Sequence, residues 1–245
     1  MTKEAEIMYL ANSGEPGRWH SKNKPFSNHD CGLTLSSIGT IMALMPSPPA
    51  RVLDLGCGSG WTSLFYARHG YDVVGQDISS DMISLGNELK SEYGVGENLN
   101  FHVCDYEDLD YSNHFDAAVF FDCLHHADDE HAALKSAYNA LKPGGVLITH
   151  EPGEGHSTTQ ASLAAVHEFG VNEKDMPPHL IVSQATKIGF RSHRIFPMQH
   201  DIHAHFYNSK PSRLLSKAGL KRAKRILEMA FKPSNNEGAI IVLNK

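Results

Sequence analysis

The sequence predicts an α/β fold in which helices cover both faces of a mostly parallel sheet. Two observations support this prediction. Short apolar runs alternate with segments of helical period between residues 51 and 150, a rhythm typical of parallel sheets. The first apolar run, Val52 to Leu55, leads directly into three alternating glycines, Gly56, Gly58 and Gly60, and then into a helical segment.

The predicted core elements follow one another regularly along the chain. Residues 1–45 are expected to be mostly helical, with one helix around residues 33–45, and the prolines after it return the chain to the first strand. Strands are predicted at 51–55, 72–76, 99–103, 115–121 and 145–150, and helices at 60–69, 79–93 and 129–141.

The segment that follows the core has weaker signals. Helices are predicted at 159–169 and 180–189, and strands at 192–197 and 238–243. Residues 200–205 alternate between polar and apolar side chains and are also predicted as a strand.

The glycine turn between the first strand and the first helix predicts a nucleotide-cofactor site. Trp61 stands where a dinucleotide fingerprint needs its third glycine, and no Gly-Lys-Ser/Thr follows, which argues against NAD, FAD and a P-loop. Asp77 ends the second strand 21 positions after Gly56, a spacing typical of a carboxylate that accepts bonds from ribose hydroxyls. A ribose site without a pyrophosphate site indicates S-adenosylmethionine.

From these residues the sequence resembles the class I S-adenosylmethionine-dependent methyltransferases. The resemblance covers about residues 50–152, and its motifs are VLDLGCGSG (52–60), VVGQDIS with Asp77, CDYEDL (104–109), FDAAVFFDCLHH (115–126) and LKPGGVLITHEP (141–152). It implies a three-layer sandwich with a seven-stranded, mostly parallel sheet, an antiparallel last strand, a helical N-terminal cap and lid insertions. At 245 residues, one elaborated domain is expected. Within this single domain, 1–245, we expect a cap (1–45), a cofactor-binding core (50–152), a lid insert (153–182) and a basic insert (199–237) between the last two strands.

The resemblance also implies which residues hold the cofactor. Asp105 would bond the adenine amino group, beside a backbone donor from Tyr106, and Phe121 would lie near the methionine moiety. Asp54 either contacts the cofactor or only orders the glycine turn. Trp19 would shield the site and Arg18 would meet the methionine carboxylate, unless both simply pack in the cap. The full predicted set is Trp19, Asp54, Gly56, Gly58, Gly60, Asp77, Ile78, Asp105, Tyr106 and Phe121.

Histidines are concentrated in the part of the chain expected to surround the acceptor. Eleven of the sixteen lie between His125 and His205. If the acceptor is a hydroxyl, an imidazole is suited to remove its proton near neutral pH. His126, His150 and His156 are therefore predicted as catalytic candidates, with loop capping or other structural roles as the alternative. Positioning of an activated methyl donor is a second alternative that needs no base.

A metal site is considered and not expected. On a strand, Asp201, His203 and His205 would share one face and resemble a two-histidine, one-carboxylate set. Tight metal sites usually gather ligands from several elements, and a sulfonium methyl donor is already activated. We therefore predict that catalysis needs no metal.

Charge is distributed unevenly along the chain. Residues 210–232 hold eight basic residues and one acidic residue, a net of +7, whereas the remaining chain has 14 basic and 27 acidic residues, a net of −13. This segment is either a solvated helix face or attracts an anionic acceptor or a membrane surface. Nucleic acid is a third anionic partner for this segment, and it is the least expected of the three because the chain as a whole is acidic.

Composition predicts a cytoplasmic enzyme. No apolar run approaches the roughly 18 residues of a membrane span, and the first residues lack the apolar core of a signal peptide. The four cysteines form no CxxC pair, which fits a reducing compartment. The sequence therefore predicts a methyltransferase of a small-molecule or saccharide acceptor, most simply at oxygen. The alternatives are a methyltransferase of RNA or protein, and a non-catalytic adenosylmethionine-binding protein.

Overall fold

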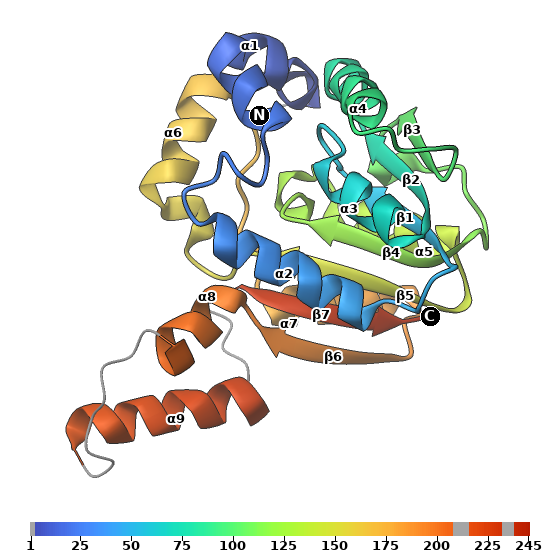
Figure 1. Cartoon of the computed structure of the whole chain (residues 1–245). Helices are drawn as coiled ribbons and strands as arrows, with labels where there is room; N and C mark the ends of the chain where they lie inside the picture. Colours follow the sequence, from blue (N-terminus) through green and yellow to red (C-terminus); the bar gives the residue numbers. More distant parts are fainter. Residues whose placement is uncertain (1–2, 208–215, 232–237) are drawn as a thin grey trace.

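Seven strands form one sheet in the order β3-β2-β1-β4-β5-β7-β6 (Figure 1). Strands β1 to β5 pair in parallel, whereas β7 runs antiparallel to both β5 and β6. This arrangement confirms the predicted mostly parallel sheet with an antiparallel last strand. The strands are β1 (Arg51–Leu55), β2 (Asp72–Asp77), β3 (Leu99–Val103), β4 (Phe115–Phe121), β5 (Leu141–Glu151), β6 (Ser192–Pro197) and β7 (Ala239–Asn244).

The structure is a computed structural model that describes residues 3–207, 216–231 and 238–245. Of the basic segment 210–232 that the sequence singles out, residues 210–215 and 232 lie outside these ranges. The central strands read as continuous apolar runs because helices bury them on both faces. In β4, for example, residues 117–120 are fully buried.

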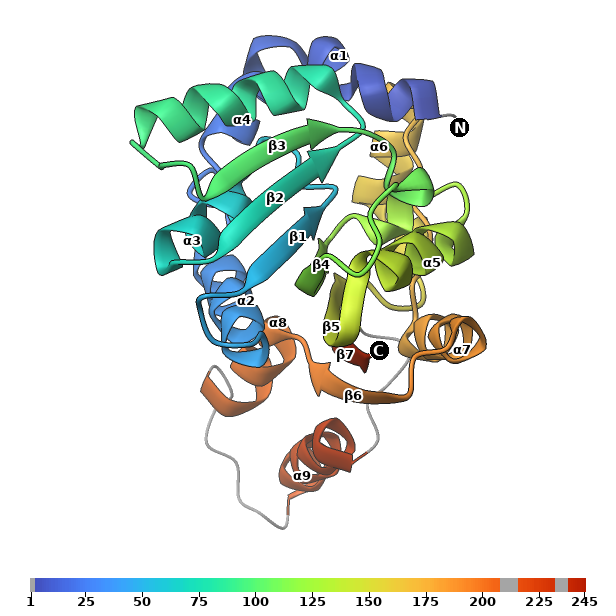
Figure 2. The same ribbon diagram turned by 90° about the vertical axis from the view of Figure 1, so that its right-hand side faces the viewer.

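The helices divide between the two faces of the sheet. Helices α2 (Cys31–Leu44), α3 (Trp61–His69) and α4 (Ser80–Glu92) contribute side chains to one hydrophobic cluster. Helices α5 (Glu130–Ala140) and α7 (Pro178–Ile188) pack into a second cluster on the other face (Figure 2). These layers make the predicted three-layer sandwich.

Helix α1 (Lys3–Lys22) crosses the end of the sheet where β1 to β3 finish (Figure 1). It bends at Gly14, whose φ of 61° is left-handed, just before Pro16. Its first part packs beside α6 (Gln160–Phe169), where the rings of Tyr9 and Phe169 lie 5.1 Å apart. The N-terminal segment is therefore helical, as predicted.

The predicted strand at 200–205 is wrong. Residues 199–207 form the short helix α8 (Gln199–Ile202) followed by η4 (His203–Tyr207), a π-helical turn. The N–H groups of Asp201 and Ile202 bond to the carbonyl of Met198, which begins the helix. Six alternating residues are a weak strand signal, and here tertiary contacts decide the conformation.

Short 3₁₀ turns follow several strands and shape the carboxyl edge of the sheet. These are η1 (Tyr106–Asp108), η2 (Leu124–His126) and η3 (His156–Thr158), and the last helix is α9 (Lys217–Phe231). Among the described residues, no helix combines the length and apolar character needed to cross a membrane.

Candidate functional site

Two cavities lie at the carboxyl ends of the central strands and meet at the glycine turn after β1. The first, of about 330 Å³, and the second, of about 160 Å³, share Gly56, Gly58, Met82 and Asp122 in their walls. Strand order reverses between β1 and β4, and the crevice at such a point is where open α/β sheets bind ligands. The two cavities therefore occupy the position that the fold favours for a binding site.

The three glycines of the turn have different roles. Gly58 has a φ of 55°, and no atom lies within 4 Å of the place where a Cβ would sit, so its backbone is open to a ligand. A Cβ on Gly56 would lie 2.9 Å from the Cys123 side chain. Gly60 lines neither cavity, and its Cβ would lie 2.3 Å from the ring of Phe101. The first two glycines thus shape the cavities, whereas Gly60 allows close packing beneath the turn.

Asp77 connects the glycine turn to the second cavity. Its Oδ2 accepts a bond from the backbone N–H of Gly58 at 2.8 Å, and its Oδ1 accepts one from Ser79 at 2.9 Å. Burial raises the pKa of this carboxyl, against the lowering effect of those N–H groups. Asp77 and the adjacent Ile78 both line the second cavity, and their contact with the cofactor stays a prediction.

The N-terminal helix forms part of the wall of the second cavity. Asp105 and Tyr106 line the wall, and the Tyr106 hydroxyl donates to the carbonyl of Cys123 at 3.1 Å. Lys3 of α1 lies 2.5 Å from Asp105 Oδ2 and 2.8 Å from Glu107 Oε2. A cation thus already pairs with the carboxylate expected to bond adenine, a contact that no local motif predicts.

The first cavity places a lysine and an aspartate in one chamber. Lys24 and Asp122 both line it, and the structure shows no ion pair between them and no hydrogen bond of the Lys24 ammonium within the described ranges. Burial lowers the pKa of Lys24, opposed by the charge of Asp122. Burial also acts to raise the pKa of Asp122, but nearby His125, His150 and Lys24 outweigh it and lower that pKa. Asp122 also has a φ of 57°, a strained conformation that is common at functional sites.

Neither residue belonged to the predicted set. Lys24 lies in the expected cap and Asp122 directly follows the strand predicted at 115–121, and neither stands in a motif that marks it as a cofactor residue.

The three candidate histidines lie in three different places. His150 lines the first cavity, His126 lines the second, and His156 lines neither. The ring of His150 stacks on that of Phe121 with centroids 4.4 Å apart, and its Nε2 lies 3.1 Å from Ser37 Oγ. Its Nδ1 is buried without a partner, and burial lowers its pKa below the usual value. His200 of α8 also lines the first cavity.

His125 and His126 belong to a buried network beside the cavities. The fully buried Glu151 accepts the backbone N–H groups of Cys123 and Leu124 and lies 2.8 Å from His125 Nδ1. Burial alone would lower the pKa of His125, but the bond to Glu151 raises it to about 9. The pKa of His126 falls to about 4 through burial and the neighbouring His125. This network holds η2 against the end of β5.

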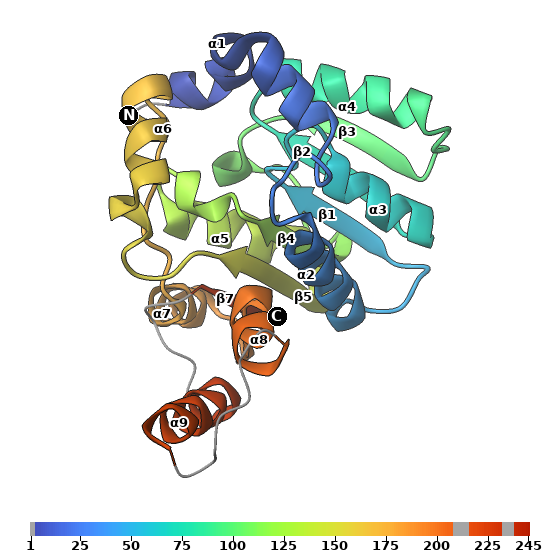
Figure 3. The ribbon, with the colours of Figure 1, turned by 60° about the vertical axis from the view of Figure 1, so that its left-hand side comes forward.

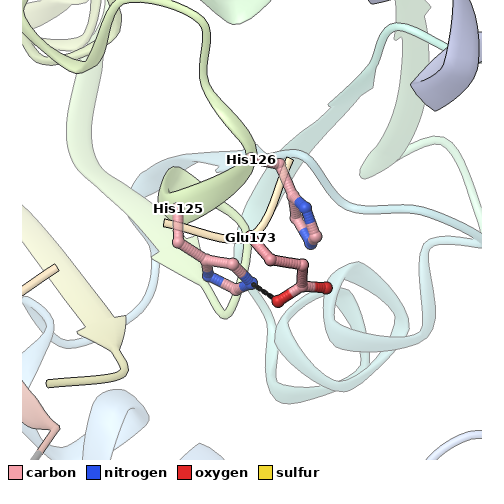
Figure 4. Close-up of side chains that lie close together, drawn as sticks. All are labelled: His125, His126 and Glu173. Atoms are coloured by element: carbon pink, nitrogen blue, oxygen red, sulfur yellow. Dashed lines mark ion pairs between the residues drawn. The ribbon is translucent and has the colours of Figure 1, made fainter. Parts of the chain in front are cut away.

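Figure 4 shows His125, His126 and Glu173, which bring one side-chain nitrogen or oxygen atom each to within 4.8 Å of one another. These groups already have protein partners. His125 bonds Glu151, His126 Nδ1 lies 2.5 Å from the carbonyl oxygen of Asn172, and Glu173 Oε2 lies 2.7 Å from His156 Nε2. Hydrogen bonding therefore accounts for this cluster, and metal-independent catalysis stays a prediction.

The predicted metal-like face of Asp201, His203 and His205 does not exist, because these residues are helical. Asp201 pairs with Arg225 at 2.7 Å, and His205 Nε2 lies 4.0 Å from Asp201 Oδ1, one helical turn away. His203 instead lines a separate third cavity between α2 and η4.

Two further predicted cofactor residues lie outside both cavities. Trp19 is 62% exposed, and the neighbouring Arg18 pairs with Glu88 at 2.6 Å. Asp54 is buried, and its Oδ2 accepts the hydroxyls of Thr62 and Ser63, both at 2.6 Å. Burial raises the pKa of Asp54 to about 6. Asp54 thus fixes the start of α3, the structural role left open by the sequence.

Comparisons with known proteins agree with this geometry. Residues 52–145 match a family model described as a methyltransferase domain. Over 112 residues the chain is 32% identical to a ubiquinone/menaquinone biosynthesis C-methyltransferase, UbiE, of Vibrio cholerae. The aligned part covers 42% of this chain and 42% of that protein. Over 111 residues it is 32% identical to the tRNA 5-carboxymethoxyuridine methyltransferase of Escherichia coli, covering 44% of this chain and 42% of that protein. The chain thus spans less than half the length of these curated relatives.

Among solved structures, the chain is similar to phosphoethanolamine N-methyltransferase 2 of Haemonchus contortus in complex with S-adenosyl-L-methionine, with a TM-score of 0.68 and 18% identity. The match covers 100% of this chain and 60% of that one, and it shows a shared fold. The matched domain, the motif order and the sheet order together support a class I S-adenosylmethionine-dependent methyltransferase.

Proposed function

We propose that the protein transfers a methyl group from S-adenosylmethionine to a small-molecule acceptor, at an oxygen atom. The observation that carries the proposal is the pair of cavities that meet at Gly56 and Gly58. The second cavity has the acidic groups that suit an adenosine. The first is larger and polar, and it has room for the amino-acid end of the donor beside an acceptor.

The second cavity would hold the adenosine. The lone pairs of Asp77 that remain free of backbone bonds would accept the ribose hydroxyls. Ile78 would pack against the base, and Asp105 would accept the adenine amino group. Since Lys3 pairs with Asp105, its ammonium would shift toward Glu107, with which it is already paired.

The amino-acid end of the donor is a zwitterion, and the first cavity offers one group of each sign. Lys24 would bind the carboxylate and Asp122 the ammonium. An isolated lysine is costly to keep in a cavity, so an anionic ligand group there would be strongly favoured. This assignment replaces Arg18, whose guanidinium is engaged by Glu88.

Methyl transfer needs the acceptor in line with the carbon–sulfur bond and away from water. The acceptor oxygen attacks the methyl carbon, the carbon–sulfur bond breaks with its electron pair going to sulfur, and the hydroxyl proton leaves to a base. His150 is the best-placed candidate base among the predicted histidines, because it lines the first cavity and its lowered pKa keeps it neutral at pH 7. The methyl donor itself supplies the leaving group, so no metal is required.

Two other functions fit the same fold. The protein could methylate RNA or protein, as the E. coli relative named above does with tRNA, or it could bind adenosylmethionine without catalysis, because one fold supports many functions. The polar wall of the first cavity favours a small acceptor over RNA or protein. His150 in that wall favours a catalytic protein over one that only binds adenosylmethionine.

The proposal is tested in two steps. Calorimetry should show binding of S-adenosylmethionine and S-adenosylhomocysteine but not of NAD. Radiolabelled donor, incubated with a cell extract fractionated by size, should then label the low-mass fraction. Label only in RNA or protein would contradict a small acceptor, and binding without any label would indicate a non-catalytic protein.

With an acceptor identified, His150→Ala should lower kcat by roughly 10²–10⁴ while donor affinity stays near wild type. Because burial lowers the pKa of His150, the acidic fall in wild-type kcat should lie at a lower pH than the pKa of an ordinary imidazole. His156→Ala is the control, since His156 lies outside both cavities. Full turnover by the His150 variant would leave positioning as the better account.

A further inference from the structure

Helix α9 lies at the end of the molecule opposite α1, as the three views agree (Figure 1, Figure 2 and Figure 3). Its inner side is fixed to the preceding segment. Arg225 pairs with Asp201 at 2.7 Å, the Arg222 guanidinium donates to the carbonyl of His205 at 2.7 Å, and Met229 is buried. Its arginines thus attach the helix to the body and leave the opposite side to solvent.

The outer side of α9 carries an apolar stripe. Leu220 is 56% exposed, Leu227 is 58% exposed and Phe231 is 84% exposed. These residues are spaced by seven and four positions, so they lie on one face of the helix. Ala223 and Ala230 are exposed as well. In the adjoining η4, Phe206 and Tyr207 add two exposed aromatic rings. Exposed apolar surface of this kind usually marks an interaction site.

Lysines form a second stripe on the same helix. Lys217, Lys221 and Lys224 recur at helical spacing and are all exposed. Lys224 lies 3.5 Å from Glu228, whereas Lys217 and Lys221 show no ion pair with any residue that the structure describes. An apolar stripe beside a lysine stripe is typical of helices that lie in a membrane interface.

We propose that α9 docks on an anionic phospholipid bilayer. Leu220, Leu227 and Phe231 would enter the boundary between headgroups and acyl chains, and the lysines would meet anionic headgroups. Nucleic acid fits less well, because exposed leucine and phenylalanine side chains gain little from a phosphate backbone. The chain as a whole carries a charge of −6, so the attraction comes from this helix.

The docked surface adjoins a third cavity that borders the candidate site. The third cavity, of about 360 Å³, is lined by residues of α2 and by His203 and Tyr207 of η4. It shares Asp30, Leu33 and Gln199 with the first cavity. An acceptor at the bilayer surface would thus meet a cavity that borders the first one. This consequence rests on the proposed function, whereas lipid binding does not.

Vesicle co-sedimentation tests the proposal on the full chain, with no acceptor or methyl donor present. Vesicles of phosphatidylcholine are compared with vesicles in which one lipid in three is phosphatidylglycerol. We expect binding to the anionic vesicles only, weakened by salt because the attraction is screened. The double variant Leu227→Asp, Lys221→Glu should lose at least about tenfold in partitioning.

The matched control is Leu163→Asp, Lys187→Glu, which makes the same charge change on α6 and α7. Leu163 is 55% exposed, close to Leu227, and Lys187 is exposed. Circular dichroism checks that both variants fold, and this control should bind vesicles like the wild type. No binding to anionic vesicles, or equal loss in both variants, would overturn the proposal. So would an α9-dependent dimer, or preferential binding to RNA, in place of lipid binding.

Discussion

Asp54 and Asp77 are carboxylates near the ends of neighbouring strands, but only one of them faces a cavity. Asp77 faces the second cavity, whereas Asp54 is enclosed by the hydroxyls of α3. Asp77→Ala should therefore cost about 1.5–3 kcal/mol of donor binding, roughly 10- to 150-fold in affinity. Asp54→Asn should leave donor affinity near wild type, since its amide oxygen can still accept both hydroxyls. Calorimetry measures both, and an unchanged affinity for Asp77→Ala would contradict the ribose assignment.

Lys24 gives a second prediction at the scale of a residue, because it is expected to contact only the amino-acid end of the donor. Lys24→Met should weaken S-adenosylmethionine roughly 10- to 150-fold through the lost charge-assisted bond. The affinity for 5′-methylthioadenosine, which lacks the carboxylate, should not change. Lys22→Met is the control, since Lys22 pairs with Glu92 at the surface at 2.7 Å. Equal weakening of both ligands by Lys24→Met would point to a general disturbance of the cavity.

At the scale of elements, the sequence predicts well where a strong local signal agrees with the fold. The helix predicted at 79–93 is observed as α4, where the side chain of Ser79 caps the helix by accepting the N–H of Met82. The strand predicted at 192–197 is β6 with the same bounds. Strand β5 begins earlier than predicted, at Leu141, because that residue still pairs with Phe115 before the register shifts.

The errors have physical causes that local sequence does not contain. Residues 200–205 alternate like a strand, but Asp201 is held by Arg225 from 24 positions further along the chain. Trp19 lies on the face of α1 that is turned to solvent, and only the packing of that helix decides this. The pairing of Lys3 with Asp105 likewise joins residues 102 positions apart. The cofactor motifs are local and can be recognised in the sequence. The cavity walls contributed by α1 and α8 depend on packing between distant segments, which local sequence does not show.

On the scale of the whole molecule, Glu6 joins three separate parts of the chain. It sits in α1, accepts the backbone N–H of Asn172 at 2.9 Å, and lies 3.5 Å from His126 Nδ1 beyond β4. Burial raises the pKa of Glu6 from 4.5 to about 7, although the Asn172 bond opposes this. The cap thus meets the core through a carboxyl group that resists ionisation.

This linkage predicts how the stability of the protein depends on pH. Between pH 4.5 and 7 the folded protein keeps a proton on Glu6 that the unfolded chain has lost, so the contribution of Glu6 to stability falls as pH rises. Glu6→Gln removes this cost while its amide oxygen still accepts the Asn172 N–H. Its stability should match the wild type at pH 4, below both pKa values, and exceed it at pH 8 by about 1–3 kcal/mol, which corresponds to a Tm several degrees higher. Glu4→Gln, at an exposed position of the same helix, should show no such difference. A Glu6→Gln variant that is equally stabilised at both pH values, or less stable at pH 8, would show that the cap does not hold Glu6 in its protonated form.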